Sequence, residues 1–438
     1  MGGIEAGLAA RPDASLRRAR GALYAAFGAQ GFSLIALTSE IPTLETRLHI
    51  GDTAISLIMA AALIVAAVGS VLAGVLTGRF GSRVVLRVAQ LVVLGALIGI
   101  GAMHSFGPAL PFMMVIGGAI GGVDATSNMQ AVALEKRYGR SIIQSCYGVW
   151  AAGAALGSAA ATIAIDVHLS LVIFYVGATV LIAPGLLAVG PRLLAGVMDE
   201  TVARDPATGK PPAIPWRPMI AICVALALAY FADSTVSSAG GLYIKQDLHG
   251  HSWEYTIVYF AYAVPFMAVR FAGDRLIERF GGVPVGRAGS VVAALGFVIA
   301  IAAPDPFVAL AGFGVVGLGV AVMAPLCFAA AGRLDPAESG VAVARLNIFN
   351  YVGFLFGSSL VTGLFGAGVP ERAAIAVPLV SVAAIAALAF GFGEQRTAEH
   401  FAALAPVPPV GGSGAVSATG GAGDAITPGA AATTPTGP

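Results

Sequence analysis

Residues 76–81 read LTGRFG and residues 276–281 read LIERFG, so four of six letters recur at a spacing of 200 residues. The same spacing places Gly153 on Gly353. Each match alone is weak because glycine is abundant, but matches in two places at one spacing indicate an internal repeat. The repeat predicts two similar halves in parallel orientation.

The composition indicates that most of this chain lies in lipid. Of its 438 residues, 57% are hydrophobic and only 11% are charged, whereas soluble proteins carry about 25% charged residues. So few charges cannot cover the surface of a soluble protein of this length. The composition therefore excludes a soluble enzyme, a disordered protein and a nucleic-acid-binding protein, and the net charge of +1 offers nothing for a polyanion to recognise.

A bilayer core about 30 Å thick requires about 20 apolar residues of helix, and the sequence contains twelve such stretches. We expect an all-α integral membrane protein in which twelve transmembrane helices form two pseudo-symmetric six-helix bundles. The expected spans are 21–40, 52–76, 85–103, 108–133, 143–165, 169–190, 216–240, 252–271, 285–302, 306–331, 341–366 and 372–393.

The segments between and around these spans define the expected organisation. It consists of a basic N-terminal lead (1–20), a first bundle (21–190), a linker (191–215), a second bundle (216–393) and a low-complexity, disordered tail (394–438).

The loops differ sharply in lysine and arginine content. Of the 24 basic residues, 21 fall on one side of the predicted membrane and three, Arg47, Lys245 and Arg372, fall on the other. In this assignment Arg270 lies at the basic-side end of its span. Because loops rich in lysine and arginine stay in the cytoplasm, we expect a multi-pass protein of the cell membrane with both termini in the cytoplasm.

Motifs for cofactors and catalysis are absent from the sequence. Cys146, Cys223 and Cys327 lie in apolar stretches without a CxxC spacing, and all six histidines fall in loops or the tail. The chain contains neither a phosphate-binding P-loop nor a hydrolase signature. We expect no cofactor, no metal site and no enzymatic activity.

The loop after the second span resembles the signature of the major facilitator superfamily, Gly-x-x-x-Asp-Arg-x-Gly-Arg. Residues 74–83 read GVLTGRFGSR, with Gly78 at the acidic position, while the second copy carries Glu278. Together with twelve spans and the repeat, this resemblance covers residues 20–393 and implies a secondary transporter. In the family this loop braces the cytoplasmic gate. The resemblance thus implies a gate formed by Arg79, Arg83, Asp274, Glu278 and Arg279.

A narrower pattern is similar to the fucose-permease-like branch of that superfamily. Asp124-x-x-x-Asn128 in the fourth span precedes Gln144 early in the fifth. In that branch the acid of the fourth span is implicated in proton coupling, and polar residues of the fifth span in sugar binding. The resemblance implies that Asp124 carries the proton.

The depth of Asp124 supports the same hypothesis. An ionisable residue inside a span is costly unless it faces a cavity or a partner, and a low-dielectric cavity disfavours its charged form. Such a carboxyl takes up and releases protons readily, as coupling to a proton gradient requires. The alternative is a structural carboxylate bonded to a neighbouring helix. Glu135, on the same helix face, is assigned to the cytoplasmic charge cluster with Lys136 and Arg137.

Amide, aromatic and acidic side chains at membrane depth suit the binding of a polar solute. At the spacing of 200, Asn347 falls on Tyr147 and Asn350 on Trp150, so these positions are predicted to face each other across a cavity. The alternative is that such residues join helices, or that Asp233 pairs with Lys245. The expected substrate-binding residues are Gln30, Asn128, Gln144, Tyr147, Trp150, Asp233, Tyr259, Tyr262, Asn347 and Asn350.

These features predict a proton-coupled secondary transporter, a symporter that moves a small polar or amphipathic solute by alternating access. Two alternatives stay open: a proton-driven exporter of metabolites or drugs, and a non-transporting sensor or scaffold, which the missing acid at Gly78 favours. The expected partners are a small-molecule substrate, protons and membrane lipid; we expect a monomer with no nucleic-acid partner.

Overall fold

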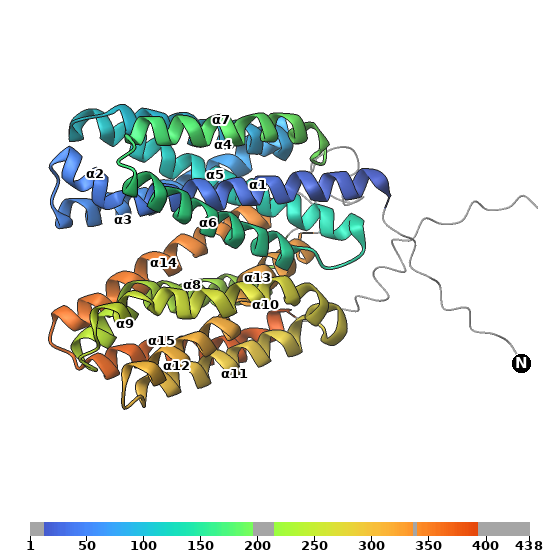
Figure 1. Ribbon diagram of the computed structural model, residues 1–438. Coiled ribbons are helices and arrows are strands. Elements are labelled where there is room, and N and C mark those ends of the chain that lie inside the picture. Colours follow the sequence, from blue (N-terminus) through green and yellow to red (C-terminus); the bar gives the residue numbers. More distant parts are fainter. Residues whose placement is uncertain (1–12, 196–213, 336–339, 393–438) are drawn as a thin grey trace, which may run out of the picture. The chain divides into compact units, whose positions relative to one another are not determined.

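The computed structural model describes residues 13–195, 214–335 and 340–392, whose regular elements are all helices (Figure 1). The first bundle contains α1 (Ala14–Ser39), α2 (Ile41–Leu48), α3 (Asp52–Phe80), α4 (Ser82–Ala102), α5 (Phe106–Tyr138), α6 (Ile143–Asp166), α7 (Leu171–Val189) and η1 (Gly190–Arg192). The second bundle contains α8 (Trp216–Gln246), α9 (Ser252–Thr256), α10 (Val258–Phe280), α11 (Gly282–Ile301), α12 (Pro306–Val320), α13 (Met323–Arg333), α14 (Val341–Gly366), α15 (Glu371–Leu388) and η2 (Ala389–Phe392).

The helices agree with the twelve predicted spans. Eleven segments are long and apolar enough to cross a membrane, with α12 and α13 together forming one of them. The remaining predicted span, 252–271, corresponds to α10, a helix of 23 residues. This helix is the most charged of the set, because Arg270, Asp274, Arg275, Glu278 and Arg279 all lie in its second half.

Some predicted boundaries differ from the observed helices. Asp13 caps α1 by accepting a hydrogen bond from the Ala14 backbone N–H, so the first span begins at Ala14 rather than at residue 21. The remainder of the predicted lead (1–12), most of the linker (196–213) and the tail (394–438) lie outside the described residues.

The placement of Arg270 at a helix end was wrong. Arg270 lies in the middle of α10, twelve residues after Val258 and ten before Phe280, and is only 4% exposed. The helix continues for more than two turns beyond the predicted span, and this extension on the basic side contains Asp274, Arg275, Glu278 and Arg279. A cation counted among the loops therefore belongs to the interior.

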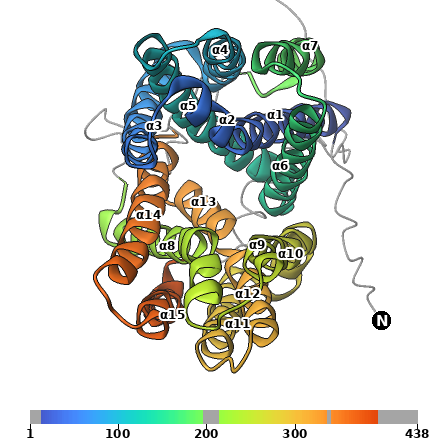
Figure 2. The same ribbon diagram turned by 60° about the vertical axis from the view of Figure 1, so that its left-hand side comes forward.

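The internal repeat recurs in helix packing. A Cβ atom added to Gly153 of α6 would lie 2.1 Å from the Gly28 carbonyl oxygen of α1, and one added to Gly353 of α14 would lie 2.3 Å from the Ala227 oxygen of α8. Figure 2 shows both pairs side by side. Without a hydrophobic driving force in lipid, close backbone approach at small residues supplies much of the packing energy.

The helices of both bundles run between two ends of the protein, which we call the basic end and the far end. The basic end is where the described chain begins at Asp13 and finishes at Phe392; the far end is where α2 and α9 lie (Figure 1). Between the bundles, α3 packs against α14 and α6 packs against α10. The largest hydrophobic cluster crosses from the first bundle into the second through Phe328 and Leu346.

Replacing Gly153 with leucine tests this close packing. The side chain would meet the backbone of α1, so we expect Gly153→Leu to lower the free energy of unfolding by about 3 kcal/mol, measured as a lower Tm in detergent micelles. The matched control is Gly177→Leu in α7, where an added Cβ meets nothing within 4 Å. Equal Tm values for the two variants would contradict the packing account.

Candidate functional site

Asp124 lies in the middle of α5 and joins helices of both bundles. Its carboxylate accepts hydrogen bonds from the Gln30 side-chain amide of α1 and from the Tyr351 hydroxyl of α14. The Asn128 amide donates to the Asp124 backbone oxygen at 2.9 Å. The predicted coupling residue therefore bonds to side chains of both bundles.

Tyr147 of α6 extends this network toward the second bundle. Its hydroxyl donates to Asn128 Oδ1 at 2.9 Å, and it is 7% exposed. Its ring lies 5.5 Å from that of Phe27 and 6.2 Å from that of Phe328 of α13, between ring centroids. These contacts hold the ring between the bundles.

Asp233 of α8 forms a second acidic centre. The Tyr262 hydroxyl of α10 donates to Asp233 Oδ1. Tyr262 is buried, while the neighbouring Tyr259 is 51% exposed. Lys245, the alternative partner of Asp233, instead lies over the Tyr255 ring at 5.7 Å. Asp233 thus belongs to the interior.

Arg270 is a site residue that sequence reasoning missed. Its guanidinium carbon lies 4.0 Å from the Phe266 ring centroid and 4.9 Å from that of Tyr147. Its Nε has no hydrogen-bond partner among the described residues. Tyr230 of α8, also missed, is buried, with its ring centroid 4.9 Å from that of Phe354 of α14. The interior therefore combines two acids with one cation.

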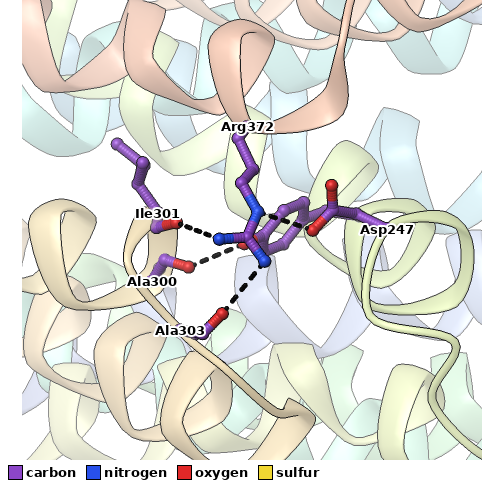
Figure 3. A network of polar contacts seen from close by, with 6 residues as sticks. Asp247, Ala300, Ile301, Ala303 and Arg372 are labelled. Carbon is purple, nitrogen blue, oxygen red and sulfur yellow. Dashed lines mark hydrogen bonds and ion pairs between the residues drawn. The ribbon is translucent and has the colours of Figure 1, made fainter.

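The guanidinium of Arg372 at the far end donates three hydrogen bonds (Figure 3). It donates to Asp247 Oδ2 at 2.8 Å and to the carbonyl oxygens of Ile301 and Ala303 at 3.3 and 3.1 Å. These bonds join α15, α8 and the end of α11 within the second bundle. The Nε of Arg270, by contrast, has no hydrogen-bond partner among the described residues.

The N-terminus of α6 is held by two carboxylates at the basic end. Asp274 of α10 accepts from the Gln144 and Ser145 backbone N–H groups at 3.0 Å each, and from the Ser141 hydroxyl at 3.0 Å. Glu135 of α5 accepts from the backbone N–H groups of Ile142 and Ile143 at 2.9 and 3.1 Å. The first-turn amides of a helix lack partners within the helix and favour negative charge. Asp274 thus fastens the second bundle to the first.

The pseudo-equivalent contact between α3 and α14 uses different chemistry. The spacing of 200 pairs Gly74 with Asp274 and Ala344 with Gln144. A Cβ added to Gly74 would lie 3.0 Å from Ala344 Cβ, and Ser70 Oγ donates to the Ala344 oxygen at 3.2 Å. Close packing here replaces the charged contact of the other copy.

In the described part of the chain, one of the five predicted gate residues bridges the bundles. Asp274 does so, whereas Arg79 and Arg279 lie over the rings of Phe80 and Phe280, neighbours in their own helices. Arg83 donates to the Pro191 oxygen at 3.2 Å, within its own bundle, and Glu278 is exposed. Glu135, expected to join a charge cluster, bonds to backbone amides instead.

The predicted substrate residues separate into three groups. Gln30, Asn128, Tyr147, Asp233 and Tyr262 belong to the interior network. Gln144 and Asn347 lie in the basic-end interface, where the Gln144 amide donates to the Val322 oxygen at 3.1 Å and the Asn347 amide to Ser70 Oγ at 3.2 Å. Asn350 is buried, Trp150 is partly buried and Tyr259 is exposed.

Tyr351 was missed although the sequence contained a signal for it. It follows Asn347 by four residues, so the two share a helix face. As for metal sites, the described residues contain no group of three or more His, Cys, Asp or Glu side chains placed to hold an ion.

Comparisons with known proteins agree with this architecture. The model of the Major Facilitator Superfamily matches residues 222–427. An uncharacterized MFS-type transporter of Yersinia pestis is 26% identical over 341 residues, which cover 77% of this chain and 86% of that protein. FucP in its outward conformation superposes with a TM-score of 0.71 at 15% identity, covering 87% of this chain and 100% of FucP. This chain has the major facilitator fold.

A second solved structure shares that major facilitator fold. The human organic anion transporter MFSD10 (TETRAN) gives a TM-score of 0.69 at 15% identity, covering 84% of this chain and 99% of that chain. The twelve-helix prediction and the resemblance to the superfamily are confirmed, and FucP shares the fold of this chain. The family match and the fold support a membrane transporter.

Replacing Asp274 tests the basic-end contact. Asp274→Asn removes the charge that binds the α6 amides, and hydrogen bonds to charged groups contribute about 1.5–3 kcal/mol. We expect a rise of roughly tenfold to hundredfold in the population with an open basic end. The readout is maleimide labelling of buried Cys146, next to Ser145, in a Cys223→Ser, Cys327→Ser background.

The matched control changes another aspartate in the same way. Asp305 caps α12 at the far end, and asparagine is an equally good helix cap. Asp305→Asn should leave the labelling rate of Cys146 unchanged. A labelling rate in Asp274→Asn equal to that of the control would show that Asp274 does not hold the basic end closed.

Proposed function

We propose that this chain is a proton-coupled secondary transporter that moves a small polar or amphipathic solute across the membrane by alternating access. The observation that carries the proposal is the Asp124 carboxylate, which accepts hydrogen bonds from Gln30 in one bundle and Tyr351 in the other. A protonatable group that bridges the two moving parts is what coupling requires.

Protonation changes the bonding capacity of Asp124. An ionised carboxylate only accepts hydrogen bonds, whereas a protonated one carries an O–H donor and has less acceptor capacity. Loading a proton thus weakens the bond from Tyr351, which spans the bundles. Proton occupancy thereby biases the equilibrium between arrangements of the two bundles, as alternating access requires.

The distribution of inter-bundle contacts supports the same mechanism. Asp274 and the α6 amides close the basic end, while Asp124 and Arg270 lie at mid-depth. We propose that solute enters from the far end, binds beside Asp124, and leaves when the Asp274 contact separates. The chain acts as a monomer, because each half supplies one side of the path.

Transport by Asp124→Asn tests the coupling. Wild-type protein in proteoliposomes should accumulate a solute, selected by thermal shift from sugars, sugar acids and amino acids, under an imposed pH gradient. Because asparagine cannot carry a proton, Asp124→Asn should exchange that solute across the membrane without accumulating it. Asp305→Asn, the same change at an exposed far-end position, should behave as wild type. Accumulation by Asp124→Asn would falsify the coupling role.

We further propose that the protein lies in the cell membrane with its basic end in the cytoplasm, following the excess of lysine and arginine there. Cysteine placed at Asp166, an exposed far-end position, should react with a membrane-impermeant maleimide in intact cells. Cysteine placed at Arg287, exposed at the basic end, should react only after permeabilisation. The opposite pattern would reverse the assigned orientation.

A further inference from the structure

Arg270 is the one buried lysine or arginine among the described residues. A guanidinium stays charged in proteins because its proton cannot be removed at accessible pH. A charge at this depth therefore needs a counter-charge or a hydrated cavity. The two acids of the interior network already have donors: Asp124 has Gln30 and Tyr351, and Asp233 has Tyr262.

The surroundings of Arg270 hold the guanidinium without using all of its donors. The ring of Phe266, one turn earlier in α10, and that of Tyr147, from the other bundle, lie 4.0 and 4.9 Å away. Aromatic faces stabilise a cation without accepting its N–H bonds. The fork of N–H groups stays available, and Nε has no partner among the described residues.

We propose that Arg270 binds the carboxylate of the transported solute, so that the substrate is a small organic anion. This inference rests on the proposed transport function and names its substrate class. A guanidinium fork matches a carboxylate through two parallel hydrogen bonds. One buried cation suits a single negative charge, which favours a monocarboxylate over a solute with several charges.

The neighbouring side chains indicate where the rest of the solute lies. The Tyr147 ring centroid lies 4.9 Å from the guanidinium carbon, and Tyr259 presents an exposed ring whose centroid lies 6.2 Å from that of Tyr262. A carboxylate held at Arg270 places the body of the solute against these aromatic rings. The solute's size is limited because α3 with α14 and α6 with α10 already close the basic end.

Binding measured in detergent tests the proposal without any transport. The probes are D-gluconate, benzoate, phenylacetate and L-lactate, each compared with its neutral amide. We expect at least one carboxylate to raise the Tm of wild-type protein while its amide does not. Arg270→Gln should abolish the shift, and Arg270→Lys should weaken the affinity at least tenfold, because lysine lacks the planar fork. The matched control, Arg287→Gln at an exposed position of α11, should bind as wild type.

The comparison of acid with amide uses wild-type protein, so it decides the matter even if Arg270→Gln fails to fold. Equal shifts from acids and amides, no shift from any carboxylate of the panel, or unaltered binding by Arg270→Gln would overturn the proposal. This binding assay needs no gradient. If carboxylates bind and Asp124→Asn still accumulates the solute, only the coupling hypothesis is contradicted. If the transported solute has no carboxylate and Asp124→Asn fails to accumulate it, only the anion hypothesis is contradicted.

Discussion

The cost of placing charge inside a bilayer governs the arrangement of this protein. Lipid offers no hydrogen bonds, so each interior polar group must find a protein partner or face water. Asp124 and Asp233 satisfy this requirement with tyrosine hydroxyls, and Asp124 adds the Gln30 amide. Because the donors to Asp124 come from both bundles, satisfying the acid also brings the bundles together. Arg270 meets the same requirement only in part, through aromatic faces.

The two copies of the repeat solve the closure of the basic end differently. In one contact, Asp274 binds the amides at the start of α6; in the other, Gly74 lets α3 approach Ala344 of α14. The first contact uses an ionisable group, whereas the second combines close packing at Gly74 with a neutral hydrogen bond from Ser70 to the Ala344 oxygen. A similar difference separates Gly78 from Glu278, although the three residues that follow each of them repeat.

Sequence alone predicted the parts of the structure that depend on period and composition. Hydropathy located the spans, and the spacing of 200 located the glycines that join α1 to α6 and α8 to α14. The depth of Asp124 in its span predicted a functional role for it without knowledge of its partners. Arg270 was not predicted as an interior residue, because a basic residue near the end of an apolar stretch is typical of a loop. Its interior position follows from the continuation of α10 to Phe280. Tyr351 was not predicted, because its hydrogen bond to Asp124 depends on α14 facing α5. Contacts between helices of different bundles leave no local pattern in the sequence.

Asp124 and Arg270 together suggest why the site would carry a proton with an anion. An anion entering a cell moves against a membrane potential that is negative inside, at a cost of about 2.3 kcal/mol per charge for each 100 mV. A proton bound at Asp124 cancels the charge of a carboxylate bound at Arg270, so the loaded site moves no net charge. An empty site with Asp124 ionised and Asp233 neutral would be balanced as well by the Arg270 cation. Both the loaded and the empty protein can then change conformation without separating charge across the bilayer, which is the condition for rapid cycling in both directions.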